Sequence, residues 1–445
     1  MTDARDDASP PPADPPHWMR GLLLFFSGQT VSLLGSMLVQ YAIFWYLTME
    51  FRSGSVMMLA AVFGFLPQAI VSIFGGVWAD RHNRKLLIIA ADGSIAITTA
   101  ILALLLLAGY APLWLIFLTL AIRSAGAGIQ TPAVSAMIPQ ISPQRHLMRV
   151  NGIMQTINSI MMLIAPAAAG AIFAWATLRT GSGLQALLPI FAIDVVTAAI
   201  GIALLSLVRV TKVDRSAEEP VGYFADLAAG IRYVFGHAFV RWLLVLYAVV
   251  FLFTVAPSNL TPLMVVRTFP AGDEAGDVVN LTILELAFSI GMALGGILVA
   301  VWAAGRDRIT LITGASLAFA VLSIVLGLSP NVWIFFGAMF LTGLVVPFFG
   351  TTAMTLLQET VEPERQGRVF GFVGIVMALA MPVGMLGFGP LADVMPVEVL
   401  LVAAGVATIV VVVIALVIPA GRRAVASARA MSRTADGSGD VSSDV

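Results

Sequence analysis

The sequence contains no cysteine and little charge, and each shortage excludes a class of chemistry. Without Cys, its 445 residues form no disulfide, thiolate metal site or cysteine nucleophile. Asp, Glu, Lys and Arg make up only 11% of the residues, and with a net charge of -1 the placement of charge is more informative than its total. We expect no nucleic-acid partner. Walker loops, zinc-spaced histidine pairs and serine nucleophile elbows are missing from the sequence as well. We therefore expect no enzyme activity, no cofactor and no metal ion.

Apolar residues, by contrast, make up 59% of the sequence, more than a soluble domain could cover. They fall into twelve windows, each near the roughly 20 residues that cross about 30 Å of hydrocarbon as a helix. These windows predict an all-α membrane protein with twelve spans in a plasma or inner membrane. Their approximate positions are 21–48, 56–79, 86–109, 112–136, 151–175, 186–208, 240–266, 279–304, 309–328, 332–356, 368–393 and 397–419.

Lysine and arginine are distributed unevenly between the two ends of the predicted spans. If the N-terminus lies inside, 20 of the 24 residues of these two types fall in cytoplasmic segments, three fall outside and one lies within a span. Positive charge marks the cytoplasmic side of membrane proteins, so we expect both termini to be cytoplasmic. The Asp- and Pro-rich composition of the first residues predicts a disordered tail at 1–20, and we expect a second tail at 421–445.

The longest break between windows divides the chain into two units of six spans. This break covers 209–239 and separates an N-terminal bundle at 21–208 from a C-terminal bundle at 240–420. Within the break, apolar residues three and four positions apart predict a short amphipathic helix at 223–235. We expect this helix to lie on the cytoplasmic face of the membrane.

The two halves also repeat each other in sequence. Similar linkers at 143–152 and 363–371 join the fourth and fifth windows of each half. Parallel repeats of six spans are typical of one class of secondary transporters. A loop after the second window adds a dense pattern of charge of the form G-x-x-x-D-R-x-N-R-K. Its defined positions are Gly76, Asp80, Arg81, Asn83, Arg84 and Lys85.

This loop resembles that of the major facilitator superfamily, whose pattern is G-x-x-x-D-R-x-G-R-R/K, and the similarity extends over nearly the whole chain. Asn83 replaces the second glycine, and asparagine is the next most tolerant residue of a left-handed turn. Within the family, the chain is most similar to twelve-helix drug exporters, the branch of macrolide-efflux proteins and siderophore exporters. The residues behind this second resemblance are Ala79 to Lys85, Ile193-Asp194, Gln358 to Gly371, Pro382 and Gly384. The fold implied is two six-helix bundles related by a pseudo-twofold axis.

The resemblance also implies that this loop is a cytoplasmic gate. Asp80 would meet the start of the eleventh helix, where free N–H groups favour an anion, and Arg81 or Arg84 would pair with a nearby acidic side chain. Gly76 would permit the two helices to approach closely. Such a latch would stabilise the outward-open state. The alternative is a solvated loop whose basic residues, Lys85 among them, only follow the distribution of charge.

A glycine-rich motif of the family's drug-proton antiporters, g-x8-G-x3-G-P-x2-G-G, matches the fifth window in part. Gly152, Pro166 and Gly170 stand at their motif positions. The residues that replace glycine are Met161, Ala165 and Ala169. Alanine is small enough for close helix approach and methionine is not, which weakens the inference of antiport from this motif alone.

Four ionisable residues, Arg123, Asp194, Glu285 and Asp92, lie inside the windows, where a charge is costly and usually functional. Arg123 falls near the midplane and matches the arginine of the family's fourth helix. We hypothesise that it lines a central water-filled cavity with one or more carboxylates. Proton uptake by a carboxylate, with Asp194 and Glu285 favoured, would then drive substrate exit. Two alternatives stay open: Arg123 and Asp194 form a structural ion pair, and Glu285 faces an outer vestibule.

In this fold the substrate should contact the first, fourth, seventh and tenth helices. Their large apolar side chains and few neutral amides suit a bulky, mostly apolar ligand better than a sugar or an amino acid. The candidate contacts are Gln40, Tyr41, Trp45, Phe253, Asn259, Phe340 and Phe349. Each aromatic residue among them has the alternative of facing lipid or a neighbouring helix.

The sequence therefore predicts a monomeric secondary transporter that exports hydrophobic compounds by proton antiport and alternating access. Its expected partners are the small hydrophobic substrate, protons and the lipid bilayer. One alternative is a siderophore or metabolite exporter of the same mechanism. Another is a non-transporting membrane receptor, which would not need Arg123, Asp194 and Glu285 buried together.

Overall fold

The computed structural model describes residues 18–209, 231–302, 306–418 and 421–422, and the regular elements of these residues are helices. Twelve helical segments among them are long and apolar enough to cross a membrane, which confirms the predicted fold class. The N-terminal half holds α1 (Trp18–Phe51), α2 (Gly54–Arg81), α3 (Arg84–Leu107), α4 (Leu113–Ile141), η1 (Gln144–His146), α5 (Leu147–Thr180) and α6 (Gly183–Leu207). The C-terminal half holds α8 (Ala238–Asn259), α9 (Thr261–Thr268), α10 (Glu274–Trp302), α11 (Arg308–Gly327), α12 (Val332–Thr360), α13 (Pro363–Val394) and α14 (Val397–Val417).

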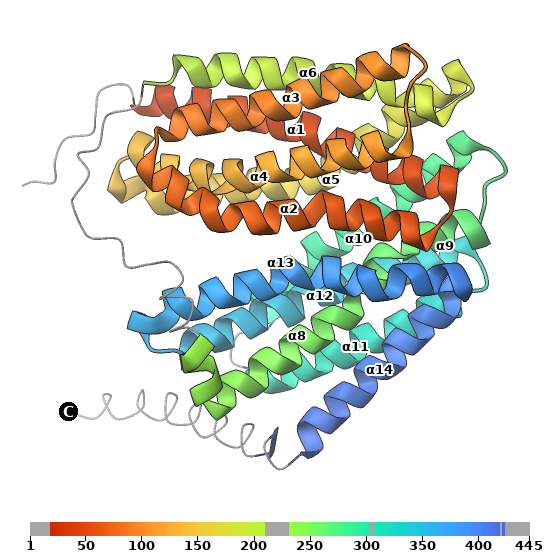
Figure 1. The fold of residues 1–445 in the computed structure, drawn as a ribbon. Helices are drawn as coiled ribbons and strands as arrows, with labels where there is room; N and C mark the ends of the chain where they lie inside the picture. The colour runs from red at the N-terminus through yellow and green to blue at the C-terminus, as the bar shows by residue number, and fades with distance from the viewer. Residues whose placement is uncertain (1–17, 210–230, 303–305, 419–420, 423–445) are drawn as a thin grey trace, which may run out of the picture.

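The helices of both halves run between two ends of the molecule, which Figure 1 shows at its left and right. We call the end where α1 begins and α14 ends the linker end, and the opposite end the far end. The linker end carries the connections at 82–83, 142–143, 208–209, 306–307 and 361–362. The far end carries those at 52–53, 108–112, 181–182, 269–273, 328–331 and 395–396.

The buried apolar side chains show where the two halves are joined. At the far end one core spans both halves and includes Leu47 and Phe173 of the first and Leu263 of the second. At the linker end each half has a core of its own, with Met137 in one and Leu243 in the other. The ribbons accordingly converge at the far end and diverge at the linker end (Figure 1).

The seventh span is broken, whereas a single helix over 240–266 was predicted. α8 ends at Asn259 and α9 begins at Thr261. Two prolines flank the break, Pro257 within α8 and Pro262 in the first turn of α9. Proline has no N–H to donate, and its ring clashes with the preceding turn of a helix, which accounts for the interruption.

The predicted tails lie mostly outside the described residues. Residues 18–20 differ from the prediction, because they form the first turn of α1, and that helix therefore begins earlier than the apolar window at 21–48. Residues 421–422 are helical as well. The apolar windows did not include these two segments, because a helix can continue beyond the apolar residues by which a window is recognised.

Of the predicted linker, 209–239, only residue 209 and the last part belong to the described residues. Residues 231–236 are helical, and α8 begins at Ala238. Tyr233 and Val234 are buried in the linker-end core of the C-terminal half, so this part packs into the bundle instead of lying on its surface. The rest of the predicted amphipathic helix at 223–235 lies outside the described residues.

Candidate functional site

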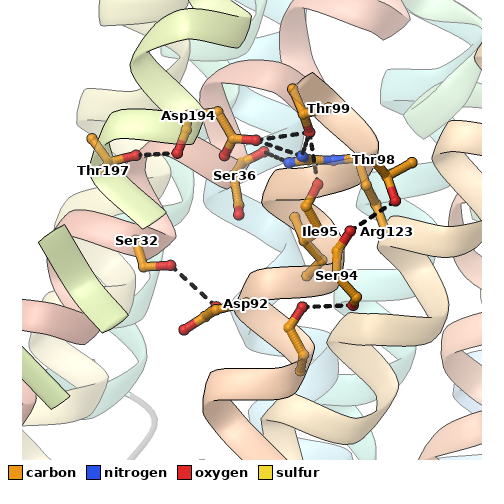
Figure 2. Close-up of polar contacts among 11 residues, drawn as sticks. Ser32, Ser36, Asp92, Ser94, Ile95, Thr98, Thr99, Arg123, Asp194 and Thr197 are labelled. Atoms are coloured by element: carbon orange, nitrogen blue, oxygen red, sulfur yellow. Dashed lines mark hydrogen bonds and ion pairs between the residues drawn. The ribbon is translucent and has the colours of Figure 1, made fainter. Parts of the chain in front are cut away.

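A buried ion pair lies in the N-terminal half and joins four helices. The Arg123 Nη1 of α4 donates to Asp194 Oδ2 of α6 at 2.6 Å. Thr99 of α3 donates to the same oxygen at 3.0 Å and accepts from Arg123, whose Nη2 donates to the Ser36 carbonyl of α1 at 3.3 Å. Figure 2 shows these side chains pointing toward one another. Asp194 is 1% exposed and Arg123 8% exposed, so both charges are removed from solvent and neutralise each other.

A glycine on α1 permits this arrangement. A Cβ at Gly35 would overlap the Thr197 hydroxyl and lie 3.0 Å from Asp194 Cα. The backbones of α1 and α6 therefore approach closely beside the ion pair, which only a residue without a side chain permits. The pairing of Arg123 with Asp194 is one of the two readings that the sequence left open.

A second buried carboxylate, Asp92 of α3, has a different environment. Its Oδ1 accepts from Ser32 Oγ of α1 at 3.2 Å and from Gln130 Nε2 of α4 at 2.6 Å. Its Oδ2 is buried without a hydrogen-bond partner among the described residues, as is the Nε2 of Gln29 one turn before Ser32. Asp92 is 2% exposed, and no basic group of the described residues contacts it. Two carboxylates of the same bundle thus differ in whether a cation neutralises them.

Two adjoining cavities border the broken seventh span, and one of them lies between the two halves. The first, of about 260 Å³, is lined by the C-terminal half. The second, of about 230 Å³, is lined by α1 and α2 of the N-terminal half and by α8, α9, α10 and α13 of the other. Both are lined by Ser258 and Asn259, at the end of α8, and by Met381 of α13. The break in the helix therefore borders both cavities, where irregular backbone is tolerated in a membrane protein.

Most of the predicted substrate contacts line these cavities. Four of them border the second cavity, and Phe349 borders the first, where its ring stacks on Tyr247 at a centroid distance of 4.8 Å. Phe253 and Phe340 line neither cavity. Phe253 packs edge-on against Phe388, and the backbone carbonyl of Phe340 abuts Gly291 of α10. The four residues at the second cavity are Gln40, Tyr41, Trp45 and Asn259.

Several lining residues were not predicted. Phe288 and Phe319 come from α10 and α11, and Met381 precedes Pro382 on α13. These three lie outside the four helices that were searched for substrate contacts. In the sequence these residues are marked only by the apolar character of their windows, and this does not show whether a side chain faces a cavity or the lipid.

Glu285 of α10 lines the second cavity with Tyr41 and is separate from the Arg123 pair. It is half-buried, and no basic side chain of the described residues contacts it or lines either cavity. Arg123, Asp194 and Asp92 do not line the cavities, in contrast to the expected shared site. The structure thus separates one cavity-facing carboxylate from a polar cluster buried within the N-terminal half. Among the described residues no three His, Asp or Glu side chains converge as a metal site.

The charged loop after α2 is tied to its own half at the linker end. Arg84 donates to the carbonyls of Ala79 at 3.0 Å and Ala136 at 2.8 Å. Lys85 Nζ donates to the carbonyls of Ser206 at 2.6 Å and Val208 at 2.9 Å, at the end of α6. Basic side chains at a helix C-terminus satisfy carbonyls that have no partner within the helix.

Two details of this loop differ from the prediction. Asn83 has φ -70° and ψ 110°, not a left-handed turn, because its side chain caps α3 by accepting from the N–H groups of Lys85 and Leu86. An N-cap residue takes extended backbone angles, which explains the difference. A Cβ at Gly76 would meet open space, so no close approach occurs there in this structure. The side chain of Asp80 lies outside the described residues.

The glycine-rich motif on α5 includes one position of close contact between the halves. A Cβ at Gly170 would overlap the hydroxyl of Thr282 on α10, whereas a Cβ at Gly152 would meet open space. Pro166 is buried inside α5. The motif therefore serves helix packing between α5 and α10 at Gly170 and not at Gly152.

We expect Gly170→Ala to destabilise the protein by about 1 to 3 kcal/mol, because the added methyl group overpacks the crossing of α5 and α10. Thr282 has little freedom to move away, since its hydroxyl donates to the Val278 carbonyl at 2.7 Å. Thermal unfolding in detergent measures the effect. Gly152→Ala is the matched control, and because its Cβ meets open space it should not lower the unfolding temperature. Equal unfolding temperatures for the two variants would contradict the prediction.

Comparisons with known proteins agree on the kind of molecule. The sequence model of the Major Facilitator Superfamily matches residues 25–284 and 274–435. Macrolide efflux protein A of Streptococcus pyogenes is 32% identical over 381 residues, which cover 85% of this chain and 90% of that protein. The Staphyloferrin A transporter of Staphylococcus aureus is 23% identical over 377 residues, covering 83% and 89%. A bacterial homologue of the human lysosomal transporter Spinster, in an inward-facing and unoccupied conformation, has a similar fold. Its TM-score is 0.66 at 16% identity, over 95% of this chain and 99% of that chain.

Proposed function

The chain belongs to the major facilitator superfamily of membrane transporters, and we propose that it exports bulky, mostly apolar compounds in exchange for protons. The pair of adjoining cavities carries this proposal, because their lining is mostly apolar with the neutral amides of Gln40 and Asn259. Their joint volume is of the size of pockets for drug-sized ligands, which begin at roughly 300 Å³. The 32% sequence identity to macrolide efflux protein A supports export as the direction of transport.

We assign the linker end to the cytoplasm, since the loops at that end hold most of the basic residues. The far end then faces outward. With this orientation, the joint core at the far end and the separate cores at the linker end support an inward-facing state. In this state a substrate reaches the cavities from the cytoplasm, as the first step of export requires.

The coupling ion in this proposal is a proton carried by a buried carboxylate. Asp194 is paired with the cation of Arg123. Glu285 and Asp92 have no basic partner among the described residues, and Glu285 also lines the substrate cavity. We therefore assign proton uptake in this state to Glu285, with Asp92 as a second site. A proton and a cationic apolar substrate would compete for the charge of Glu285, which links the two fluxes.

The alternative of an anionic siderophore as substrate has less support from the site. A ligand with several carboxylates needs cationic side chains to replace its hydration. Neither cavity is lined by Lys or Arg of the described residues. Arg123, a buried cation of the N-terminal half, is already paired with Asp194. The site therefore favours a neutral or cationic apolar compound.

Transport into proteoliposomes tests the proposal. With the purified protein and a macrolide as probe, we expect an imposed pH gradient to drive accumulation at least fivefold above the level with a protonophore. A pH-sensitive dye in the lumen should report protons moving opposite to the substrate. Accumulation that is indifferent to both the gradient and the protonophore would exclude proton antiport. Failure to transport any of a panel of lipophilic compounds would exclude the substrate class.

A further inference from the structure

At the far end, a carboxylate of the C-terminal half caps the first turn of α2 in the N-terminal half. Asp393, at the end of α13, accepts from the N–H groups of Gly54 at 2.6 Å and Ser55 at 2.9 Å. The Ser53 hydroxyl donates to the same carboxylate at 3.1 Å. The N–H groups of the first helical turn have no partner within the helix and carry partial positive charge, so they bind an anion well.

Arg267 of α9 contacts both the end of α13 and the loop before α2. Its guanidinium donates to the Ala392 carbonyl at 2.5 Å and contacts Asp393 Oδ1 at 3.3 Å. The Nε donates to the Arg52 carbonyl, in the loop between α1 and α2, at 2.8 Å, and Nη2 donates to the same oxygen. Arg52 has a left-handed φ of 45°, and its side chain reaches Asp277 of the C-terminal half at 3.7 Å. We call the contacts of Asp393 and Arg267 with residues 52–55 the far-end clamp.

Two glycines bring α2 and α13 into backbone contact beside the clamp. A Cβ at Gly54 would overlap the Gly389 carbonyl, and a Cβ at Gly389 would overlap the side chain of Met58. The hydrogen bonds of Asp393 to α2 need this short separation. Any rotation of the halves that opens the far end therefore has to break charge-assisted hydrogen bonds and separate the two glycines.

The sequence repeats the pattern of the clamp at the opposite end of the same pair of helices. α13 ends in Gly389-Pro-Leu-Ala-Asp393 at the far end, and α2 ends in Gly76-Val-Trp-Ala-Asp80 at the linker end. These two helices are neighbours with opposite directions, one from each half (Figure 1). Each therefore presents the pattern G-x-x-A-D near the N-terminus of the other.

From these observations we propose that Asp393 is the gating residue of the far end, whose contact with the start of α2 holds the protein in the inward-facing state and breaks when the far end opens. The proposal rests on alternating access as part of the proposed function, and not on the substrate or the coupling ion. Ser53→Ala would remove only one contact of the Asp393 carboxylate, whereas Asp393→Asn replaces the anion with a neutral amide at all of that carboxylate's contacts and leaves the Arg267 contacts with Arg52 in place.

Spin-label distances test the clamp without a transport assay, and the natural absence of cysteine makes labelling specific. One label pair at Tyr110→Cys and Pro330→Cys spans the far end. A second pair at Met148→Cys and Gln358→Cys spans the linker end. In Asp393→Asn we expect the ratio of far-end-closed to far-end-open molecules to fall roughly tenfold or more, as loss of charge-assisted hydrogen bonds implies. The far-end distance then lengthens while the linker-end distance shortens.

Glu398→Gln is the matched control, since Glu398 accepts from Thr268 of its own half at 2.5 Å and should leave both distances unchanged. Gly54→Ala is a second variant that forces the helices apart without removing a charge, and it should shift both distances in the same direction as Asp393→Asn. Unchanged distances in Asp393→Asn would overturn the proposal, and so would equal shifts in Asp393→Asn and Glu398→Gln. A wild type with intact distances and no transport would instead refute the proposed function.

Discussion

Replacing Arg123 with alanine is expected to destabilise the protein by about 3 to 5 kcal/mol, the usual cost of leaving one partner of a buried ion pair uncompensated. Asp194 is 1% exposed, and among the described residues its side chain would retain only the hydroxyl of Thr99 as a hydrogen-bond partner. The hydrogen bonds by which the Arg123 guanidinium joins α4 to α1 and α6 would be lost together. Chemical denaturation or thermal unfolding in detergent measures the change, and transport should fall to background.

The double variant Arg123→Ala with Asp194→Ala distinguishes the cost of an unpaired buried charge from the cost of losing the two side chains. Because no charge remains buried, we expect it to recover a large part of the stability that Arg123→Ala loses, so the two substitutions are strongly non-additive. Arg179→Ala is a matched control at the far end, where the guanidinium lies over Trp175 and the expected cost is about 1 kcal/mol or less. A single variant as stable as the wild type, or a double variant no better than the single, would contradict this account.

The number and order of the spans were predictable because twenty apolar residues in a row leave few other solutions in a membrane. The positions of the helix ends were less so. α1 extends to Trp18 and α2 to Arg81, beyond their apolar windows, because a helix continues into the interface as long as its backbone groups are satisfied. The break at Leu260 depends on how Pro257 and Pro262 act together, which a hydropathy window does not register.

The contacts within the site depend on which helix faces meet, and the sequence fixes this only in part. Arg123 and Asp194 were each identified as buried charges, but their pairing required α4 and α6 to present these residues to the same point. Arg123 was hypothesised to line a central cavity with one or more carboxylates, and in the structure Glu285 lines a cavity between the halves whereas Arg123 does not. Its role in coupling stays a prediction, as does the latch assigned to Asp80.

The far-end clamp shows what a search for buried charge overlooks. Asp393 lies at a helix end, where a charged residue is ordinary, and Arg267 lies outside the apolar window of its span. The signal that points to Asp393 is the G-x-x-A-D pattern that it shares with Gly76 to Asp80. The pattern indicates a contact between the halves only once α2 and α13 are known to be antiparallel neighbours.

The second large effect is expected for Glu285→Gln, which should reduce substrate accumulation driven by a pH gradient at least tenfold. Glutamine keeps the shape and the hydrogen-bonding capacity of the side chain but neither carries a negative charge nor takes up a proton. The cavity around residue 285 contains Tyr41 and Asn259 and no basic side chain of the described residues, so the charge of Glu285 has no fixed counterion there. A proton or a cationic substrate is then the natural partner, and both couplings disappear in the variant.

Exchange of substrate across the membrane without a pH gradient distinguishes coupling from folding or binding. Because the cavity keeps its shape, we expect Glu285→Gln to exchange labelled for unlabelled substrate at a rate within a few-fold of the wild type. Glu50→Gln, at an exposed carboxylate near the far end of α1, is the control and should retain accumulation driven by the gradient. If Glu285→Gln accumulates substrate normally and still moves protons, proton uptake belongs to another carboxylate. Asp92→Asn is then the variant in which the same loss of gradient-driven accumulation should be sought, since Asp92 also lacks a basic partner among the described residues.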